Sequence, residues 1–367
     1  MFSSYLSQWK EFPESVFTPF LFNPLDLKDW SAFEQLCMDS HIHISDTYQA
    51  QRDELLIVDN PTLLTKDVEH RSQVATGSHE YMKEGLWAYY PWRQTVVHIL
   101  KQYEYQRVRL SRNKNLITET EQEVISDAHV AIAGLNVGNP AAVGLVLAGV
   151  GKRFSLADLD VLSLSNLNRF RSSLCDLDLN KSVLSARQMT EINPYLEIKS
   201  YAHGIIQDSI ETFLNEDIDI LIEEIDALEL KLRLRQHARV LQIPVVMVTG
   251  NGSGVILDIE RYDLESELPT LNGYLSRSVS ERLLIDQHPL SMKEHLQLAQ
   301  DFIGKEWLTD RLLTSFRDVG ETLAGIPQLA ETTQLRGAVL THIVRSILSG
   351  SYVPSGRYSV QLHDIIS

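Results

Sequence analysis

The chain has 367 residues, of which 44% are hydrophobic, so it is long enough for one large or two moderate domains with a real core. Its 33 Lys and Arg residues against 49 Asp and Glu residues give a net charge of −16, which argues against general nucleic-acid or anionic-membrane binding. The two cysteines, Cys37 and Cys175, exclude a paired-cysteine zinc motif and a disulfide framework, so we expect no zinc site and a reducing compartment. The sequence shows no basic start followed by an apolar run, and no membrane-spanning stretch, so we expect a cytoplasmic protein.

Residues 1–104 form an N-terminal extension of unknown fold, for which we expect α+β character. Residues 29–39 predict an amphipathic helix, and residues 54–59 predict a strand. After the extension, Arg112 lies in a basic segment that precedes a short helix. Thr118 and Glu121 form a capping-box pattern at the start of that helix.

The centre of the chain reads as a strand, a glycine turn, a helix and a second strand. Residues 130–133 are small and apolar, as expected of a strand buried on both faces. Gly134 and Gly138 bracket a tight turn, after which Asn139 is placed to cap a helix that begins at Pro140. This pattern predicts the start of a mononucleotide-binding unit, in which the helix N-terminus offers an anion site.

The predicted helix ends at Gly149, and the second strand spans residues 153–157. Asp158 follows this strand, where an acidic side chain can accept hydrogen bonds from ribose hydroxyls. Strands and helices then alternate, which predicts a mainly parallel sheet. We expect helices at residues 181–192, 209–214 and 228–241, and strands at residues 197–201, 218–225, 244–249 and 255–262. The region after residue 264 is predicted to be mainly helical, with helices at residues 276–284, 291–304, 307–319 and 329–348 and a strand in the tail.

Several short motifs follow one another in this part of the chain. They are Asp158-Leu159-Asp160, Ser165-Asn166-Leu167-Asn168-Arg169, Lys181 at a helix start, Glu191-Ile192-Asn193-Pro194, and a strand that leads to Asp226. In order and spacing, these motifs resemble those of the ThiF/MoeB/ubiquitin-activating enzyme family. The resemblance covers residues 105–262. It implies an α/β fold with a Rossmann-like, mainly parallel sheet in residues 105–264, and a helical region in residues 265–367 that packs on this domain.

The resemblance also implies an activity. The family binds ATP with Mg²⁺ and activates a carboxylate as an acyl-adenylate, so this chain would be an adenylyltransferase. The acyl group would come from a carrier-protein C-terminus, a peptide or a small acid, and it would pass to an external nucleophile. Such chemistry depends on positioning and on neutralising charge at the phosphates.

The site residues follow from the same resemblance. Asp158 would contact the ribose, Asn166, Arg169 and Lys181 the phosphates, and Asp226 would hold Mg²⁺ or orient the attacked phosphate. The turn residues Gly134, Asn136 and Gly138, with Asp160, would complete the nucleotide site. Arg112 would reach the phosphates from the partner subunit of a homodimer.

Two departures from the family pattern keep alternatives open. Asn136 stands where the family has a glycine, and the turn looks one residue shorter. Cys175 is read as a partly buried small residue, not as a thioester-forming nucleophile. One alternative is therefore a catalytically impaired nucleotide-binding or interaction module with the same fold. A second is an NAD-dependent dehydrogenase, because Asp158 follows the turn by about twenty residues.

Overall fold

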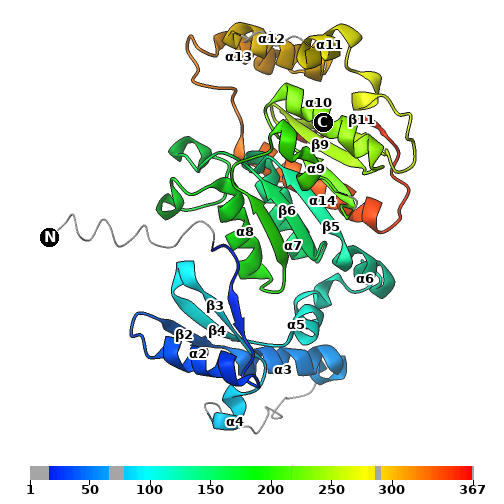
Figure 1. Ribbon diagram of the computed structural model, residues 1–367. Helices are drawn as coiled ribbons and strands as arrows, with labels where there is room; N and C mark the ends of the chain where they lie inside the picture. The colour runs from blue at the N-terminus through cyan, green and yellow to red at the C-terminus, as the bar shows by residue number, and fades with distance from the viewer. Residues whose placement is uncertain (1–15, 66–77, 216, 286–290, 366–367) are drawn as a thin grey trace, which may run out of the picture. The chain divides into compact units, whose positions relative to one another are not determined.

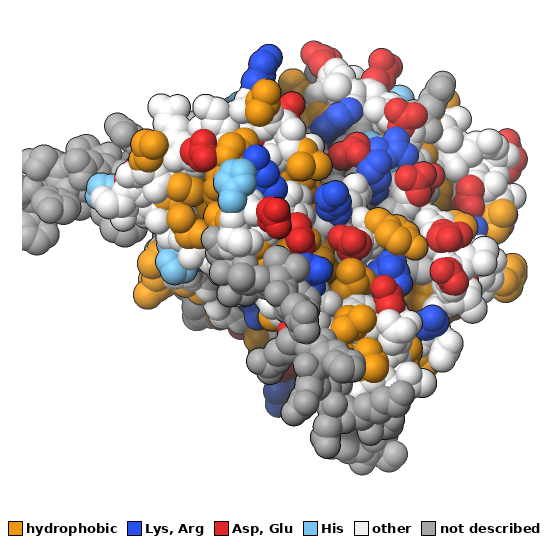
Figure 2. All heavy atoms as spheres, turned by 90° about the horizontal axis from the view of Figure 1, so that it is seen from below, with side chains coloured by type: hydrophobic (Ala, Val, Ile, Leu, Met, Phe, Trp, Pro, Cys, Tyr) orange, Lys and Arg blue, Asp and Glu red, His pale blue; other side chains and the backbone are white. Residues whose placement is uncertain are grey.

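The computed structural model describes residues 16–65, 78–215, 217–285 and 291–365 (Figure 1). The chain forms two compact units, which are Met1–Thr120 with Arg187–Leu196, and Glu121–Ala186 with Glu197–Ser367. No helix in these described ranges is long and apolar enough to cross a membrane. Figure 2 shows one face of the molecule, on which Lys and Arg side chains lie among Asp and Glu side chains rather than in a separate patch.

The first unit contains a four-stranded sheet with the order β1-β3-β4-β2. The strands β2 and β4 are parallel, and the other pairs are antiparallel. The strands are β1 (Phe20–Phe22), β2 (His43–Asp46), β3 (Leu86–Tyr90) and β4 (Thr95–Ile99), and the helices are α2 (Leu27–Cys37), α3 (Tyr48–Asp59), α4 (His79–Met82) and α5 (Gln102–Arg109). The mixture of helices and strands confirms the expected α+β character of this region.

The strand predicted at residues 54–59 is wrong, because these residues form the second half of α3. The residues before them, Gln49 to Asp53, are mostly good helix formers, and they continue the helix into the apolar run that follows. Tyr48 and Leu55 pack against Tyr81 and Leu100, so the two apolar positions two helical turns apart face one side. A short apolar run alone does not distinguish a strand from a buried helix.

The second unit is built on a seven-stranded sheet with the order β11-β10-β9-β8-β5-β6-β7. Its central strands β9, β8, β5, β6 and β7 are parallel, and β10 and β11 add an antiparallel edge, which confirms the mainly parallel sheet. The strands are β5 (His129–Ala133), β6 (Arg153–Ala157), β7 (Glu197–Tyr201), β8 (Ile220–Glu223), β9 (Val245–Asn251), β10 (Gly254–Glu260) and β11 (Gly356–Gln361).

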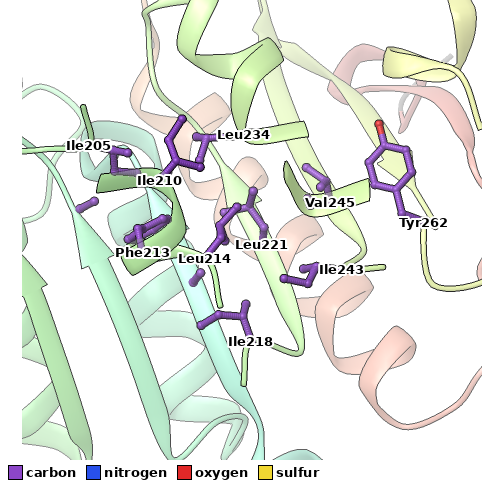
Figure 3. Close-up of a cluster of buried hydrophobic side chains, with 14 residues drawn as sticks. Ile205, Ile210, Phe213, Leu214, Ile218, Leu221, Leu234, Ile243, Val245 and Tyr262 are labelled. Carbon is purple, nitrogen blue, oxygen red and sulfur yellow. The ribbon is translucent and has the colours of Figure 1, made fainter. Parts of the chain in front are cut away.

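Helices connect and cover these strands. They are α6 (Glu119–Asp127), α7 (Leu135–Ala148), α8 (Lys181–Ile192), α9 (Ile210–Phe213) and α10 (Leu228–Val240), followed by α11 (Arg277–Ile285), α12 (Met292–Ile303), α13 (Asp310–Asp318) and α14 (Ala330–Leu348). The four helices expected after residue 264 are thus confirmed. Figure 3 shows one hydrophobic core cluster of this unit, in which Phe213 and Leu214 lie beside Leu221 of β8.

The start of α7 differs from the prediction. The helix begins at Leu135, directly after Gly134, and Pro140 lies inside it rather than at its first position. Gly134 has a φ of +88°, so the chain can leave β5 and enter the helix within a single residue. Asn139 is therefore not a cap, and its buried Nδ2 donates to Ser185 Oγ at 2.9 Å. The predicted end at Gly149 is confirmed, because this residue has the left-handed conformation of a helix C-cap.

Candidate functional site

The strand order places the predicted site residues at one edge of the sheet. Gly134 follows β5, Asp158 follows β6, and Asp226 follows β8, so all three lie beyond the carboxyl ends of neighbouring parallel strands. β5 pairs with β6, the next strand along the chain, on one side and with β8 on its other side. In open parallel sheets this reversal of strand order is where ligands bind.

Gly134 brings the turn after β5 into close contact with the segment after β8. A Cβ atom on Gly134 would lie 2.4 Å from the carbonyl oxygen of Glu224 and 2.7 Å from the backbone nitrogen of Ile225. Because both contacts are with backbone, no side-chain movement would relieve them. The absence of a side chain at Gly134 allows the start of α7 to lie in contact with the backbone that follows β8.

The other two turn residues lie in the first turns of α7. A Cβ on Gly138 would lie 2.8 Å from Cγ2 of Ile132, so this glycine permits close packing of helix on strand. Asn136 is partly buried, and its Oδ1 has no hydrogen-bond partner among the described residues. The residue that departs from the family pattern thus carries an unsatisfied acceptor at the helix N-terminus.

Asp158 organises the end of β6. Its Oδ2 accepts a hydrogen bond from the backbone N–H of Leu135 at 2.6 Å, and its Oδ1 accepts one from that of Asp160 at 2.8 Å. Burial raises the pKa of Asp158, while these two backbone N–H groups and the charge of Lys181 act in the opposite direction. The carboxylate therefore caps the first residue of α7 in addition to any contact with ribose.

Lys181 is the first residue of α8, and its side chain is only 4% exposed. Its Nζ lies 3.0 Å from Oδ2 of Asp160, whose side chain is 58% exposed. A lysine in the first helical turn is opposed by the helix dipole, so it needs a nearby anion. The exposed carboxylate of Asp160 supplies one, and it holds the ammonium group at the edge of the sheet.

The loop between β6 and α8 places Asn166 and Arg169. Asn166 is buried, and its Oδ1 accepts a hydrogen bond from the backbone N–H of Ser163 at 3.1 Å. Arg169 donates from Nη1 to the carbonyl oxygen of Ser165 and to Oδ1 of Asn168. Its buried Nε has no hydrogen-bond partner among the described residues. Burial lowers the pKa of Arg169, and the charge of Asp226 opposes this shift.

Asp226 itself is exposed. The described residues include no group of three His, Cys, Asp or Glu side chains placed to share a metal ion. Mg²⁺ in nucleotide sites is commonly held by one or two carboxylates together with substrate phosphates. A single exposed aspartate at this edge fits that mode of binding.

Three further residues complete the site, and sequence reasoning did not single them out. Asn180 caps α8, because its Oδ1 accepts from the backbone N–H groups of Ser182 and Val183. Its Nδ2 donates to the carbonyl oxygens of Asp158 and Ala202, which ties the helix start to the ends of β6 and β7. The common preference for asparagine immediately before a helix was the available signal.

Glu224 and Arg336 are the other two. Glu224 accepts a hydrogen bond from the backbone N–H of Val248 at 2.6 Å, and burial raises its pKa to about 7 against the charges of Arg336 and Lys231. Arg336 comes from α14, is 8% exposed, and has a buried Nε with no partner among the described residues. No local sequence signal marks Arg336, because the packing of a distant helix brings it here.

Two predicted features lie outside this group. Arg112 is exposed and belongs to a short 3-10 turn, Ser111–Asn113, in the first unit. Cys175 is exposed rather than partly buried, so that interpretation was wrong. Its backbone N–H donates to Ser173 Oγ in the short 3-10 turn Leu174–Asp176.

These contacts suit a phosphate-bearing ligand. A glycine turn opens a helix toward the sheet edge, which offers backbone N–H groups to an anion. Two arginines near Asp226, Arg169 and Arg336, have buried Nε atoms without partners in the described part of the chain. A buried N–H without an acceptor costs free energy, so an oxyanion at this edge would satisfy both groups.

The chain is similar in sequence to a known family and to several known proteins. The sequence model of the ThiF family matches residues 110–260. The chain is 36% identical, over 75% of its length, to Uncharacterized protein MT1398 of Mycobacterium tuberculosis (strain CDC 1551 / Oshkosh), of which it covers 38%.

Two relatives from Escherichia coli (strain K12) carry functional names. The chain is 27% identical to a tRNA threonylcarbamoyladenosine dehydratase, over 49% of this chain and 67% of that protein. It is 28% identical to a sulfur carrier protein ThiS adenylyltransferase, over 36% of this chain and 53% of that protein. The chain thus spans well under half of the mycobacterial relative and about half to two thirds of these two. Residues 110–260 thus match the ThiF family, and the ThiF-like motifs at the sheet edge lie within this range.

Proposed function

We propose that the chain is an ATP-dependent adenylyltransferase, which activates a carboxylate as an acyl-adenylate for transfer to an external nucleophile. One observation carries the proposal. A glycine turn, the buried Lys181 and the unsatisfied Nε of Arg169 meet at the edge where ThiF-family motifs converge. The relative named for adenylating the sulfur carrier ThiS supports this reaction class. The family match does not favour the NAD-dependent dehydrogenase alternative.

Each residue has a defined task in this reaction. Asp158 would accept from ribose hydroxyls beside its bond to Leu135, and the start of α7 would face the phosphates. When ATP is bound, a carboxylate oxygen attacks the α-phosphorus, the bond to the bridging oxygen breaks, and pyrophosphate leaves with that electron pair. Lys181 and Arg169 would neutralise charge on the phosphate oxygens, while Asp226 would hold Mg²⁺ beside them.

The acyl substrate is proposed to be the C-terminus of a small carrier protein or peptide, or a small acid. The similarity to a sulfur carrier protein ThiS adenylyltransferase supports the first of these. We also propose that the chain forms a homodimer in which Arg112 acts on the partner's site. The exposure of Arg112 leaves its guanidinium accessible to a second subunit.

ATP–pyrophosphate exchange tests the reaction. Purified protein would be assayed with Mg²⁺ and pools of carboxylates and carrier-protein C-termini, beside Asp226→Ala and Lys181→Ala. Loss of one such charge-stabilising group should lower the rate of exchange about 10²-fold. Lys152→Ala is the matched control, because Lys152 pairs with Glu197 just before β6 and thus lies at the opposite edge of the sheet.

The outcomes are distinct. Exchange that both site variants leave unchanged would contradict the assigned roles. ATP binding by calorimetry without exchange would favour the impaired-module alternative, and NAD binding in place of ATP would favour the dehydrogenase.

A mixing experiment tests the dimer. Arg112→Ala and Lys181→Ala subunits alone are each expected to exchange about 10²-fold more slowly than wild type. If Arg112 acts in trans, a mixed dimer regains one complete site and exchange returns. If mixing restores nothing although mixed dimers form, Arg112 does not act across the interface.

A further inference from the structure

Helix α14 packs closely against α7, and this packing positions Arg336. A Cβ on Gly337 would lie 2.6 Å from Cβ of Pro140 and 2.9 Å from its carbonyl carbon. One turn further along, a Cβ on Gly144 of α7 would lie 2.4 Å from Oγ1 of Thr341. Glycines on both helices thus allow close backbone approach. Arg336, next to Gly337, is thereby carried to the first turns of α7.

The guanidinium of Arg336 lies against the end of β9. A Cβ on Gly250 would be 2.0 Å from Nη2 and 2.8 Å from Cζ of Arg336, so the arginine occupies the space that a side chain would need. The residue is 8% exposed, and its Nε has no hydrogen-bond partner among the described residues. A buried cation that lacks full hydrogen bonding is costly unless something compensates it.

The charges around Arg336 compensate it only in part. Burial lowers the pKa of Arg336, Glu224 and Asp226 oppose this, and the like charge of Arg169 reinforces it. One carboxylate oxygen of Glu224 is already engaged by the backbone N–H of Val248. The pair of arginines therefore has room for an oxyanion of another molecule.

The strand order indicates which oxyanion this is. Along the sheet edge, Asp158 follows β6, Gly134 follows β5, Asp226 follows β8, and Gly250 lies near the end of β9. Neighbouring strands are about 4.8 Å apart, so Gly250 lies about 14 Å along the edge from the proposed ribose position. Arg336 is thus on the far side of Asp226 from the ribose, where the second reactant would approach.

We propose that Arg336 binds the carboxylate that is presented for activation. This assignment rests on the proposed function, because it places the carboxylate beside Asp226 and the attacked phosphate. Arg336 is then a specificity-determining residue, which requires a free carboxylate on the acyl substrate. Gly250 is a positioning residue, because it leaves the space in which the guanidinium lies.

Acetate is the probe for this test, because its binding requires neither ATP nor turnover. Saturation-transfer NMR would measure acetate affinity for the full chain, and calorimetry would measure Mg²⁺–ATP affinity. The variants are Arg336→Met, which keeps most of the side-chain volume, Arg336→Lys, which keeps the charge, and Gly250→Ala, which displaces the guanidinium. The matched control is Arg345→Met, because Arg345 lies on the same helix and contacts the exposed His342.

The expected result is that Arg336→Met weakens acetate binding about tenfold, the value of a hydrogen bond to a charged group. Gly250→Ala should act in the same direction, Arg336→Lys should lie in between, and Arg345→Met should have no effect. ATP affinity should stay within about twofold. Thermal unfolding of each variant would verify that it remains folded.

Three results would overturn the assignment. They are no saturation transfer to acetate in the wild type, acetate binding that Arg336→Met leaves unchanged, or a tenfold loss of ATP affinity with acetate binding intact. The last would make Arg336 a phosphate ligand. If acetate binding depends on Arg336 but no carboxylate supports exchange, the anion site stands and the proposed reaction fails.

Discussion

Gly134→Ala tests the geometry on which the whole site depends. The substitution adds a Cβ that would lie 2.4 Å from the carbonyl oxygen of Glu224 and 2.7 Å from the backbone nitrogen of Ile225. Relief requires the turn after β5 to move away from the segment after β8. The expected cost has two parts, about 1–3 kcal/mol for a side chain at a φ of +88° and about 1–3 kcal/mol for overpacking.

Gly320→Ala is the control that separates these parts. Gly320 has a φ of +86°, almost the same as Gly134, but nothing lies within 4 Å of its added Cβ. Its substitution should therefore show the conformational cost alone. The difference between the two variants, about 1–3 kcal/mol, is the contribution of the clash.

The assay is urea unfolding with hydrogen exchange of residues 129–133, which form β5 in the second unit. This readout is needed because a chain with two units need not unfold in one transition. Gly134→Ala should also weaken ATP binding in calorimetry, whereas Gly320→Ala should not. If the two variants lose the same stability to within about 0.5 kcal/mol, the close contact between the turn and β8 is not a constraint, and this account of the site is wrong.

Three other predictions follow from single residues. Glu224→Gln should alter the pH dependence of stability, because the folded-state pKa of Glu224, about 7, lies above its ordinary value of 4.5. The protonated carboxyl stabilises the wild-type fold at low pH, and this contribution is lost as pH rises from about 4.5 to 7. In urea unfolding, the stability of the variant relative to wild type should therefore increase over that range. A constant difference between pH 5 and pH 8 would contradict it. Arg235→Met should lower the free energy of unfolding in urea by about 3–5 kcal/mol, because Arg235 is fully buried between Glu223 and Glu260, at 2.6 Å from each. The control is Arg233→Met, which removes an arginine from a partly exposed ion pair on the same helix. Equal losses in the two variants would refute the prediction. Asn136→Gly should bind ATP within about tenfold of wild type by calorimetry, because the departure from glycine alters the turn without closing it. Absence of ATP binding in both proteins would refute that expectation.

The local elements of the second unit could be predicted because their signals are short-range. The helix Lys181–Ile192 and the strand Arg153–Ala157 have the predicted bounds. Apolar periodicity and glycine stops act within a few residues, so they can be read without knowledge of the fold. The motifs from Asp158 to Asp226 could likewise be read from the sequence. The structure places them at one sheet edge, because parallel strands bring their carboxyl ends together.

Other features needed the tertiary structure. The helix after β5 starts five residues before Pro140, because the close approach of Gly134 to Glu224 and the hydrogen bond from Leu135 to Asp158 determine where the chain turns. Residues 54–59 are helical because α3 packs as one element on Tyr81 and Leu100.

The clearest case is Arg336. It is 110 residues from Asp226 in the chain, and nothing in its local sequence distinguishes it from a solvated helical arginine. The sequence by itself determined most elements of the second unit and the ThiF-like motifs, because propensities, caps and motif spacings are local. Only the packing of α14 on α7 decided that a second, incompletely satisfied arginine lies beside those motifs, because contacts between distant segments depend on how all the elements fit together.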